Sequence, residues 1–302
     1  MPVRLTSTHF TSKERCGTQF NKRMKIIRGL AWLSDVGQVL VLDRLNSKRR
    51  RVSELASTAC RELKFHSRAK IRSLPLAEII AMISHTPFEQ VSLPGPFTDL
   101  NDVGSMNGYH VLGSLVRALE PKTILEFGTY LGVSTQTMAL NAPAHCRIYT
   151  IDLPDDAAPE EIPELDRIDQ QHIRKSRYRV GEAFLNSPTR RKIAQIRVDS
   201  MRFRADGEMG EMDLVFIDGG HSRPIVKHDT ETAFGFLSKA GTIIWDDYFH
   251  SYPDVVRFLD ELHAQVPLYG ITGTNLVIYS RRFFASAPKR TTPLRAATAV
   301  AS

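Results

Sequence analysis

An acidic residue closes each of three apolar runs in the sequence: Asp152, Asp218 and the adjacent pair Asp246 and Asp247. Such runs predict strands of a parallel sheet, whose carboxyl ends meet at the edge where open α/β sheets bind ligands. Carboxylates that converge there repel one another, and a hard divalent cation commonly relieves the repulsion. We therefore predict Asp218, Asp246 and Asp247 as ligands of Mg²⁺. The adjacent pair can share one ion only if its strand ends at Trp245, because neighbouring side chains of a continuing strand point to opposite faces.

A histidine lies three residues after Asp218, in the stretch Ile-Asp-Gly-Gly-His that ends at His221. In this place its imidazole could take a proton from a hydroxyl close to the metal. The sequence therefore predicts His221 as a general base. A hydrogen-bonding surface histidine is the alternative interpretation.

A glycine-rich stretch joins a predicted strand to a predicted helix. It runs from Glu126 to Ser134 as Glu-Phe-Gly-Thr-Tyr-Leu-Gly-Val-Ser. Gly128 permits a sharp turn, Gly132 permits close approach of the backbone to a ligand, and the following helix directs free N–H groups at an anion. Several nucleotide-binding folds share such a turn. Asp152, at the end of the next strand, is placed to accept hydrogen bonds from the ribose hydroxyls of S-adenosylmethionine or NAD.

The elements that must position these residues alternate between apolar strands and amphipathic helices from about residue 100 onward. The predicted strands are 123–128, 147–152, 193–198, 213–218 and 241–245, and the predicted helices are 106–119, 134–140, 224–237 and 254–266. This alternation predicts an α/β fold with a Rossmann-like, doubly wound, mostly parallel sheet. Two last runs, 267–271 and 276–280, flank Thr272-Gly-Thr274 and predict a hairpin that leaves the final strand antiparallel.

One connection, residues 153–192, is too long for a simple crossover. Loops of this length in a compact domain usually have a function or carry their own structure. We predict a helix over residues 163–174, placed as a lid or as a wall of the substrate site.

The N-terminal part differs in charge from the rest. Residues 1–75 contain 17 Lys or Arg and 5 Asp or Glu, and they include the run Lys48-Arg-Arg-Arg51. This basic arm could contact an anionic partner, and a solvated arm is the competing interpretation. We predict a basic, helical or partly disordered segment over residues 1–100, a catalytic domain over 101–283 and a disordered tail over 284–302.

Composition indicates the compartment in which the protein works. The three cysteines are far apart and form no C-x-x-C pair, and no uninterrupted apolar stretch is long enough for a membrane span. The chain also begins without a secretion signal, so we predict a cytoplasmic protein without a transmembrane segment. Whether the Ser/Thr-rich first thirty residues form a targeting peptide, and whether the chain forms homo-oligomers, stays open.

Together these motifs resemble class I S-adenosylmethionine-dependent methyltransferases. The stretch from Ile124 to Ser134 resembles the first motif of the O-methyltransferase type. Ile-Asp-Gly-Gly-His followed by Trp-Asp-Asp-Tyr resembles the branch that includes macrolide-sugar O-methyltransferases and cephalosporin-hydroxylase-like proteins. The resemblance covers about residues 104–280 and leaves the first hundred residues unmatched.

This resemblance assigns a role to each motif. It implies that S-adenosylmethionine contacts the residues Glu126, Gly128, Thr129, Gly132, Ser134, Asp152, Asp199 and Ser200. Glu126, Gly128 and Ser134 would contact its methionine part, Asp152 its ribose, and the pair Asp199–Ser200 its adenine. The implied reaction is methyl transfer to a hydroxyl of a small molecule, such as a sugar or another natural product, assisted by Mg²⁺ at Asp218, Asp246 and Asp247 and by His221 as base.

Three other functions compete with this interpretation. An NAD-dependent oxidoreductase would use the same glycine-rich turn but has no evident use for the later acids. A nucleic-acid methyltransferase could use the basic arm. We do not expect nucleic acid as a partner, however, because the fourth strand ends in Asp-Gly-Gly-His rather than in the Asn- or Asp-Pro-Pro-aromatic signature of amino-methylating enzymes. A binding protein that keeps the fold without catalysis would not need the acids and His221.

Overall fold

The computed structural model describes residues 65, 69–84, 90–95, 100–204 and 209–285, and only the backbone of residues 100–105. The chain divides into two units, Met1–Ala69 and Lys70–Ser302, and the elements discussed below belong to the second. The basic run Lys48–Arg51 and most of the predicted tail lie outside the described residues. No helix in the described ranges has the length and apolar character needed to cross a bilayer.

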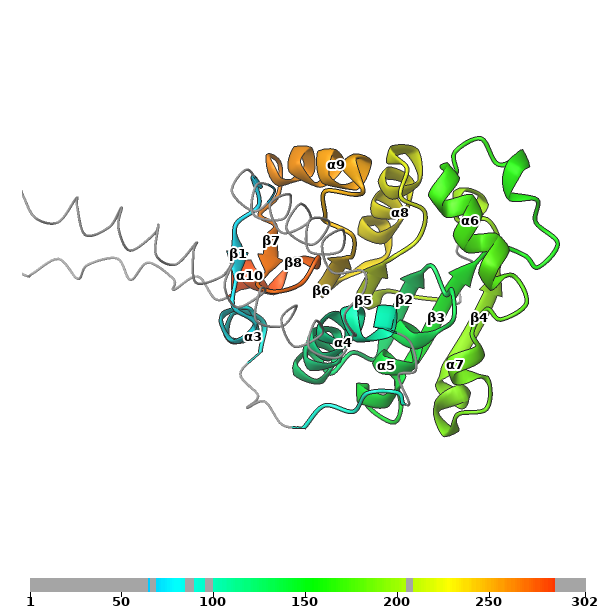
Figure 1. Ribbon diagram of the computed structural model, residues 1–302. Helices are drawn as coiled ribbons and strands as arrows, with labels where there is room; N and C mark the ends of the chain where they lie inside the picture. Colours follow the sequence, from blue (N-terminus) through cyan, green and yellow to red (C-terminus); the bar gives the residue numbers. More distant parts are fainter. Residues whose placement is uncertain (1–64, 66–68, 85–89, 96–99, 205–208, 286–302) are drawn as a thin grey trace, which may run out of the picture. The chain divides into compact units, whose positions relative to one another are not determined.

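The described strands form one mixed sheet. They are β1 Ser73–Leu74, β2 Thr123–Phe127, β3 Arg147–Asp152, β4 Ile193–Arg197, β5 Met212–Ile217, β6 Leu237–Trp245, β7 Tyr269–Ile271 and β8 Val277–Ser280. Their order across the sheet is β1-β7-β8-β6-β5-β2-β3-β4 (Figure 1). Only β8 runs antiparallel to its neighbours, β6 and β7. The predicted parallel sheet, the hairpin and the antiparallel final strand are confirmed.

Helices cover both faces of the sheet. The longer ones are α3 Leu76–Ile83, α4 Leu100–Leu119, α5 Val133–Asn141, α6 Arg167–Ser176, α8 Arg223–Phe236 and α9 Pro253–His263, with short helices α7 Glu182–Leu185 and α10 Arg282–Ala285. In Figure 1, α4 and α5 lie on one side of the central strands, and α8 and α9 lie on the other. The sheet is therefore doubly wound, as predicted.

The central strands are mostly apolar because both of their faces are covered. Ile124 and Leu125 of β2 and Leu214 and Val215 of β5 are fully buried. On one face this core packs against apolar side chains of α4, including Leu115. Each such side chain contributes about 1.5–3 kcal/mol by leaving water. This packing fixes the strand ends that carry the polar residues.

The folded unit begins earlier than the predicted boundary at residue 100. Strand β1 pairs in parallel with β7, with Ser73 opposite Gly270. Ile79 and Ile83 of α3 lie in the core together with residues of the sheet. A two-residue strand and an eight-residue helix carry too little periodicity to be read from the sequence, so this part is known only from its packing.

This packing predicts a difference between two truncations. Removal of residues 1–69 should leave the fold intact, whereas removal of residues 1–84 should destabilise it strongly. In the full chain, Ile79→Ala should lower the free energy of unfolding by about 2–5 kcal/mol, because the side chain is 0% exposed. Urea unfolding followed by circular dichroism measures the loss, and Ile80→Ala, at a half-buried position of the same helix, is the control. Equal losses for Ile79 and Ile80 would contradict this account.

Candidate active site

The order of the strands creates a crevice at one edge of the sheet. The chain runs from β2 through β3 to β4 in one direction and then returns to place β5 on the other side of β2. In open α/β sheets, ligands bind outside the carboxyl ends of the strands at such a reversal. The residues predicted from sequence as a site lie at or just after the carboxyl ends of β2, β3, β4, β5 and β6.

The turns after β2 and β5 touch each other at Gly128. This glycine has φ = +92°, and a Cβ atom placed on it would lie 1.9 Å from the backbone oxygen of Asp218. The backbone N–H of Asp218 in turn donates to the oxygen of Phe127 at 2.9 Å. Both the backbone conformation and the contact exclude any larger residue at position 128.

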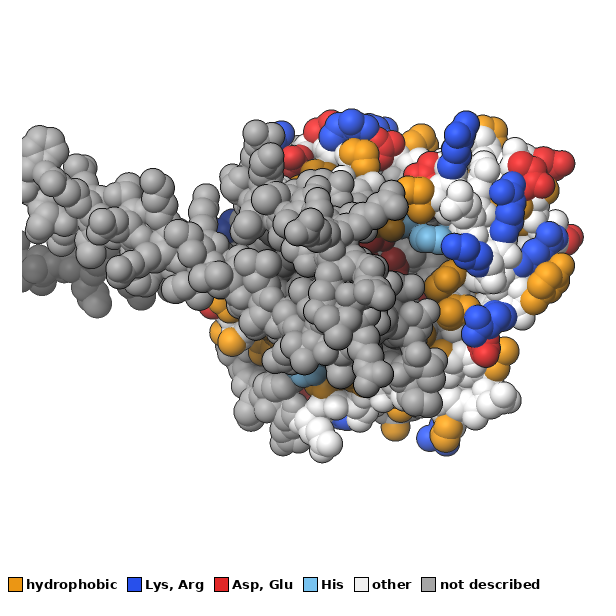
Figure 2. All heavy atoms as spheres, in the orientation of Figure 1, with side chains coloured by type: hydrophobic (Ala, Val, Ile, Leu, Met, Phe, Trp, Pro, Cys, Tyr) orange, Lys and Arg blue, Asp and Glu red, His pale blue; other side chains and the backbone are white. Residues whose placement is uncertain are grey.

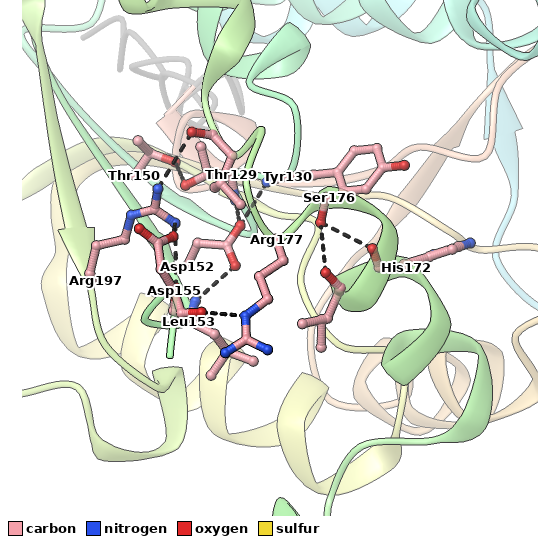
Figure 3. A network of polar contacts seen from close by, with 12 residues as sticks. Thr129, Tyr130, Thr150, Asp152, Leu153, Asp155, His172, Ser176, Arg177 and Arg197 are labelled. Carbon is pink, nitrogen blue, oxygen red and sulfur yellow. Dashed lines mark hydrogen bonds and ion pairs between the residues drawn. The ribbon is translucent and has the colours of Figure 1, made fainter. Parts of the chain in front are cut away.

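Asp152, the last residue of the neighbouring strand β3, holds the turn after β2 in place (Figure 3). Its Oδ2 accepts hydrogen bonds from the backbone N–H groups of Thr129 at 3.1 Å and Tyr130 at 2.7 Å. Its Oδ1 accepts from the N–H of Leu153 at 2.8 Å. Burial raises the pKa of Asp152, and these bonds and the nearby Arg197 oppose the rise. Asp152 thus orders the predicted cofactor turn, and its contact with a ribose stays a prediction.

Glu126 lies under the start of α5 and is 0% exposed. The hydroxyl of Ser134 donates to its Oε1 at 2.6 Å, and the hydroxyl of Thr135 donates to its Oε2. Burial raises the pKa of Glu126 to about 7 even though these hydroxyls lower it. Two predicted cofactor residues, Glu126 and Ser134, are therefore bonded to each other at the N-terminus of α5.

Gly132 packs closely against another part of the chain. It has φ = +81°, but a Cβ on it would meet the ring of Phe184 at 2.7 Å and the Cα of Gly181 at 2.9 Å. Contact of Gly132 with a cofactor stays a prediction, and the close approach in this structure is to the β3–β4 insertion, residues 153–192. Two backbone bonds reinforce it, from the N–H of Gly181 to the oxygen of Tyr130 at 2.8 Å and from the N–H of Ala183 to the oxygen of Leu131 at 3.0 Å.

Asp199 and Ser200 follow β4 at the same edge of the sheet. The Oδ1 of Asp199 accepts from the N–H of Met201 at 3.0 Å and caps a short 3₁₀ helix, Ser200–Arg202. The side chain of Ser200 hydrogen-bonds Asp229 of α8, an acid whose pKa burial raises. Sequence reasoning did not identify Asp229, because it lies in the middle of an ordinary amphipathic helix.

The three predicted metal ligands lie together in one pocket. Asp218, Asp246 and Asp247 line it with His221, between the ends of β5 and β6. Strand β6 does end at Trp245, and Asp247 has φ = +62°, so the two adjacent acids turn toward the same pocket. The N–H of Asp247 donates to Oδ1 of Asp246 at 2.7 Å.

The acids of this pocket are buried close to one another, and their charges repel. Burial, followed by repulsion from Asp246 and Asp247, raises the pKa of Asp218 well above its usual value. Burial and repulsion from Asp247 raise the pKa of Asp246 to about 7. The oxygen donors and the repulsion between these acids fit a divalent cation. Among the described residues, however, no group of three or more His, Cys, Asp or Glu side chains is arranged as they stand to hold a metal ion.

His221 is held between two carboxylates. Its Nδ1 bonds Oδ1 of Asp169, its Nε2 bonds Oδ2 of Asp247 at 2.7 Å, and its ring stacks on that of Tyr252 with centroids 4.0 Å apart. Burial by itself would lower the pKa of His221, but the hydrogen bonds to Asp169 and Asp247 outweigh it and raise the pKa to about 10. In this arrangement the ring is an imidazolium at neutral pH. It can act as the predicted base only after Nε2 parts from Asp247 and loses its proton.

The structure adds Asp169 and Tyr252 to the predicted site. Asp169 lies in α6, which falls within the insertion where a helix was predicted. Its partner Asp166 caps this helix by accepting from the N–H groups of Ile168 and Asp169, each at 2.8 Å. An acid in the first turn of a helix usually complements the helix dipole. In the sequence Asp169 therefore looks like an ordinary acid at the start of a helix, and nothing indicates that it contacts His221.

The comparisons with known proteins concern this region of the chain. Residues 125–248 match a family model described as a methyltransferase domain. This stretch of the chain is therefore similar to a methyltransferase domain. This match confirms the resemblance to class I methyltransferases and the prediction that the chain is an enzyme of that kind. No curated protein matches the sequence.

Many solved structures resemble the chain at low identity. The O-methyltransferase TomG from Streptomyces achromogenes, in complex with SAM, is 15% identical, over 72% of this chain and 93% of its own, with a TM-score of 0.42. An O-methyltransferase from Bacillus cereus in complex with SAH is 19% identical over 67% and 86%, with a TM-score of 0.38. The methyltransferase PaMTH1 from Podospora anserina is 17% identical over 79% and 98%, with a TM-score of 0.41. The function proposed below rests on the family match and on the site, not on these likenesses.

The contact at Gly128 generates a stability prediction. Gly128→Ala should lower the free energy of unfolding by about 3 kcal/mol or more, because a strained φ and a backbone clash add up. Gly210→Ala is the matched control, since Gly210 also has a positive φ, +66°, but has nothing within 4 Å of its Cβ position. The control should cost only the strain, about 1–3 kcal/mol. Chemical denaturation measures both, and equal losses would show that the contact with Asp218 contributes nothing.

The shifted pKa values generate a pH prediction for the ligand-free protein. His221 has a folded pKa of about 10 against the usual 6.5, so its stabilisation is complete below 6.5 and is lost as pH rises through 10. Asp246, raised from 3.8 to about 7, also makes the folded state bind more protons, so stability falls with pH over that window. The free energy of unfolding in EDTA should therefore fall steadily from acid to alkaline pH.

Urea titrations at several pH values measure this slope. His221→Asn should reduce the loss above neutral pH by about 1.5–3 kcal/mol, the contribution of a hydrogen bond to a charged group. The exposed His145→Asn should leave the slope unchanged. A wild-type stability that rises toward alkaline pH would contradict the charge arrangement described for this pocket.

Proposed function

We propose that the protein transfers a methyl group from S-adenosylmethionine to a hydroxyl of a small molecule, such as a sugar or another natural product. One observation carries the proposal: the turn expected to hold the donor meets the loop of the acids and the histidine, at Gly128 and Asp218. A donor beside the first would have its methyl group close to the second. The family match to a methyltransferase domain supports the same reaction.

The donor would lie across the ends of β2, β3 and β4. The free N–H groups at the start of α5 suit the methionine carboxylate, and Asp152 and Asp199 suit the ribose and the adenine. Asp152 already accepts bonds from Thr129 and Tyr130, so it would share its carboxylate between this turn and the ligand. Glu126, bonded to Ser134 and Thr135, would support the site from below.

The chemistry is an in-line displacement. The acceptor oxygen forms a bond to the methyl carbon while the carbon–sulfur bond breaks, and the sulfonium loses its charge. The site would hold the reacting atoms at about 3 Å from each other. The proton of the hydroxyl goes to Nε2 of His221, in its neutral form, as that nitrogen separates from Asp247.

Magnesium assistance is a further part of the proposal. Asp218, Asp246 and Asp247 would hold the ion, and when bound it would lower the pKa of the acceptor hydroxyl. Asp247 connects the two roles, because the oxygen that now bonds His221 would turn toward the cation. Such a turn would release Nε2 for the acceptor proton.

The alternatives have less support. An NAD-dependent oxidoreductase would share the Gly128 turn but not the methyltransferase family match. A nucleic-acid methyltransferase would use the basic arm, which lies outside the described residues apart from its last part. The cytoplasmic location, an anionic partner of the arm and a homo-oligomeric state stay predictions.

Ligand binding separates these functions. S-adenosylhomocysteine at about 100 times its Kd should stabilise the protein by about 2.7 kcal/mol and raise Tm by roughly 5–10 °C, whereas NADH should not. Asp152→Asn should weaken this shift, and Asp155→Asn, on the exposed side of the same loop, should not. A shift with NADH and none with S-adenosylhomocysteine would refute the methyltransferase proposal.

Transfer itself can be screened with radiolabelled S-adenosylmethionine. Catechol and methyl glucoside serve as probes for phenolic and sugar hydroxyls, each measured with Mg²⁺ and with EDTA. We expect transfer to a hydroxyl probe that EDTA lowers by roughly tenfold or more. Full activity in EDTA would refute the role of the metal and leave that of His221 standing.

A further inference from the structure

Asp169 makes two hydrogen bonds to a single residue. Its Oδ2 accepts from the backbone N–H of His221 at 3.0 Å, and its Oδ1 bonds Nδ1 of the same residue. The side chain is 4% exposed, whereas Asp166, the N-cap of the same helix, is only half-buried. A buried carboxylate with both oxygens engaged by one histidine fixes that histidine in position and in rotation.

The rest of α6 shows that this burial is selective. Figure 2 shows Lys and Arg side chains gathered over the region of α6, and the helix contributes the exposed Arg167, Arg174 and Lys175. The opposite side of the helix buries only Asp169 and Ser176. The hydroxyl of Ser176 stays within its own helix and donates to the oxygen of His172 at 3.0 Å (Figure 3). Asp169 is therefore the buried polar group of α6 that reaches out of the helix.

We propose that Asp169 is a positioning residue for methyl transfer, which holds Nδ1 of His221 so that Nε2 is the nitrogen that meets the acceptor hydroxyl. This inference rests on the proposed function and extends it to a residue of the β3–β4 insertion.

The two ring nitrogens of His221 play different roles. An ionised carboxylate only accepts hydrogen bonds, so Nδ1 beside Asp169 keeps its proton. In a neutral ring, Nε2 then carries the lone pair, which is the form that a general base needs. When Nε2 takes the proton of the hydroxyl, Asp169 stabilises the resulting imidazolium. This division of roles is the one that a carboxylate performs toward the histidine of a catalytic triad.

Neighbouring residues hold Asp169 and the imidazole ring of His221 in fixed relative positions. Tyr252 lies against the imidazole with an angle of 12° between the two ring planes, which limits tilting. The insertion that carries α6 is bonded to the turn after β2 through Gly181 and Ala183. Arg177, just after α6, donates from Nε to the backbone oxygen of Asp155 at 2.5 Å (Figure 3). The same segment therefore contacts both the predicted donor turn and the histidine.

A purely structural role is the alternative, in which Asp169 only anchors α6. Asp166→Ala provides the control for it, because it removes the N-cap of the same helix and leaves His221 untouched. Loss of an N-cap costs about 0.5–2 kcal/mol of stability. Any effect of Asp169 that comes from loosening of α6 should appear in this control as well.

The experiment compares wild type, Asp169→Asn and Asp166→Ala as full-length proteins. Asparagine keeps the size of the side chain but offers one acceptor oxygen in place of two. For Asp169→Asn, kcat toward the hydroxyl probe that wild type methylates should fall roughly tenfold or more, the usual cost of losing the group that orients a site residue. The Kd for S-adenosylhomocysteine and the KM for the donor should stay within about threefold of wild type, and Asp166→Ala should keep the wild-type kcat.

A second readout does not depend on activity. In protein labelled with ¹⁵N-histidine, the long-range ¹H–¹⁵N spectrum of wild type should show His221 protonated at Nδ1, with a slowly exchanging proton. Asp169→Asn should shift that nitrogen and speed the exchange of its proton, and Asp166→Ala should not. If the Asp169 variant fails to fold, an unprotonated Nδ1 in the wild-type spectrum would still overturn the proposal.

The possible outcomes distinguish failure of the positioning role from failure of the proposed function. Wild-type kcat in Asp169→Asn, an equal loss in Asp166→Ala, or an unprotonated Nδ1 in wild type would each overturn the positioning role. A wild type that neither binds S-adenosylhomocysteine nor transfers methyl would instead refute the proposed function. In that case a protected Nδ1 proton would still show that Asp169 holds His221, without a catalytic meaning.

Discussion

The contact of Gly128 with the backbone of Asp218 is the constraint on which the rest of the site depends. It brings the turn after β2 against the turn after β5, and no side chain fits between them. Asp152 fixes the first turn through the N–H groups of Thr129 and Tyr130. The second turn leads directly into His221. A ligand seated on one turn therefore lies beside the other, and the buried strands β2 and β5 keep this relation rigid.

Charge is the second organising factor. Burial and repulsion between acids raise the pKa of Asp218 and of Asp246, and this repulsion is the cost of placing both beside Asp247. His221 offsets part of it by bonding Asp247 on one side and Asp169 on the other. A cation in the pocket would compete with the imidazolium for Asp247. The ligand-free site thus holds its histidine in the protonated form, and the proposed reaction needs the other form.

The sequence was most informative where a strand had to be apolar on both faces and end in a polar residue. That pattern located β2, β3, β5 and β6 and the acids behind them. It failed for β1 and α3, whose burial depends on partners far along the chain, such as Gly270 for Ser73. It gave no sign that Phe184 lies against Gly132, because a glycine does not show what approaches it, and contact of Gly132 with a ligand stays a prediction. Asp169 was missed for a related reason: the distance between α6 and β5 is set by the folded insertion and not by any spacing in the sequence.

The central claim is that the donor turn and the pocket of acids around His221 form one reaction site. Its most direct test is the single-turnover rate of methyl transfer from saturating S-adenosylmethionine in wild type and in His221→Asn, with the Kd for S-adenosylhomocysteine measured alongside. The account predicts a rate roughly a hundredfold lower or more in the variant, the usual contribution of a positioned base, with the Kd within about threefold of wild type. An unchanged rate would contradict it, because the two turns would then share an edge of the sheet without sharing a reaction.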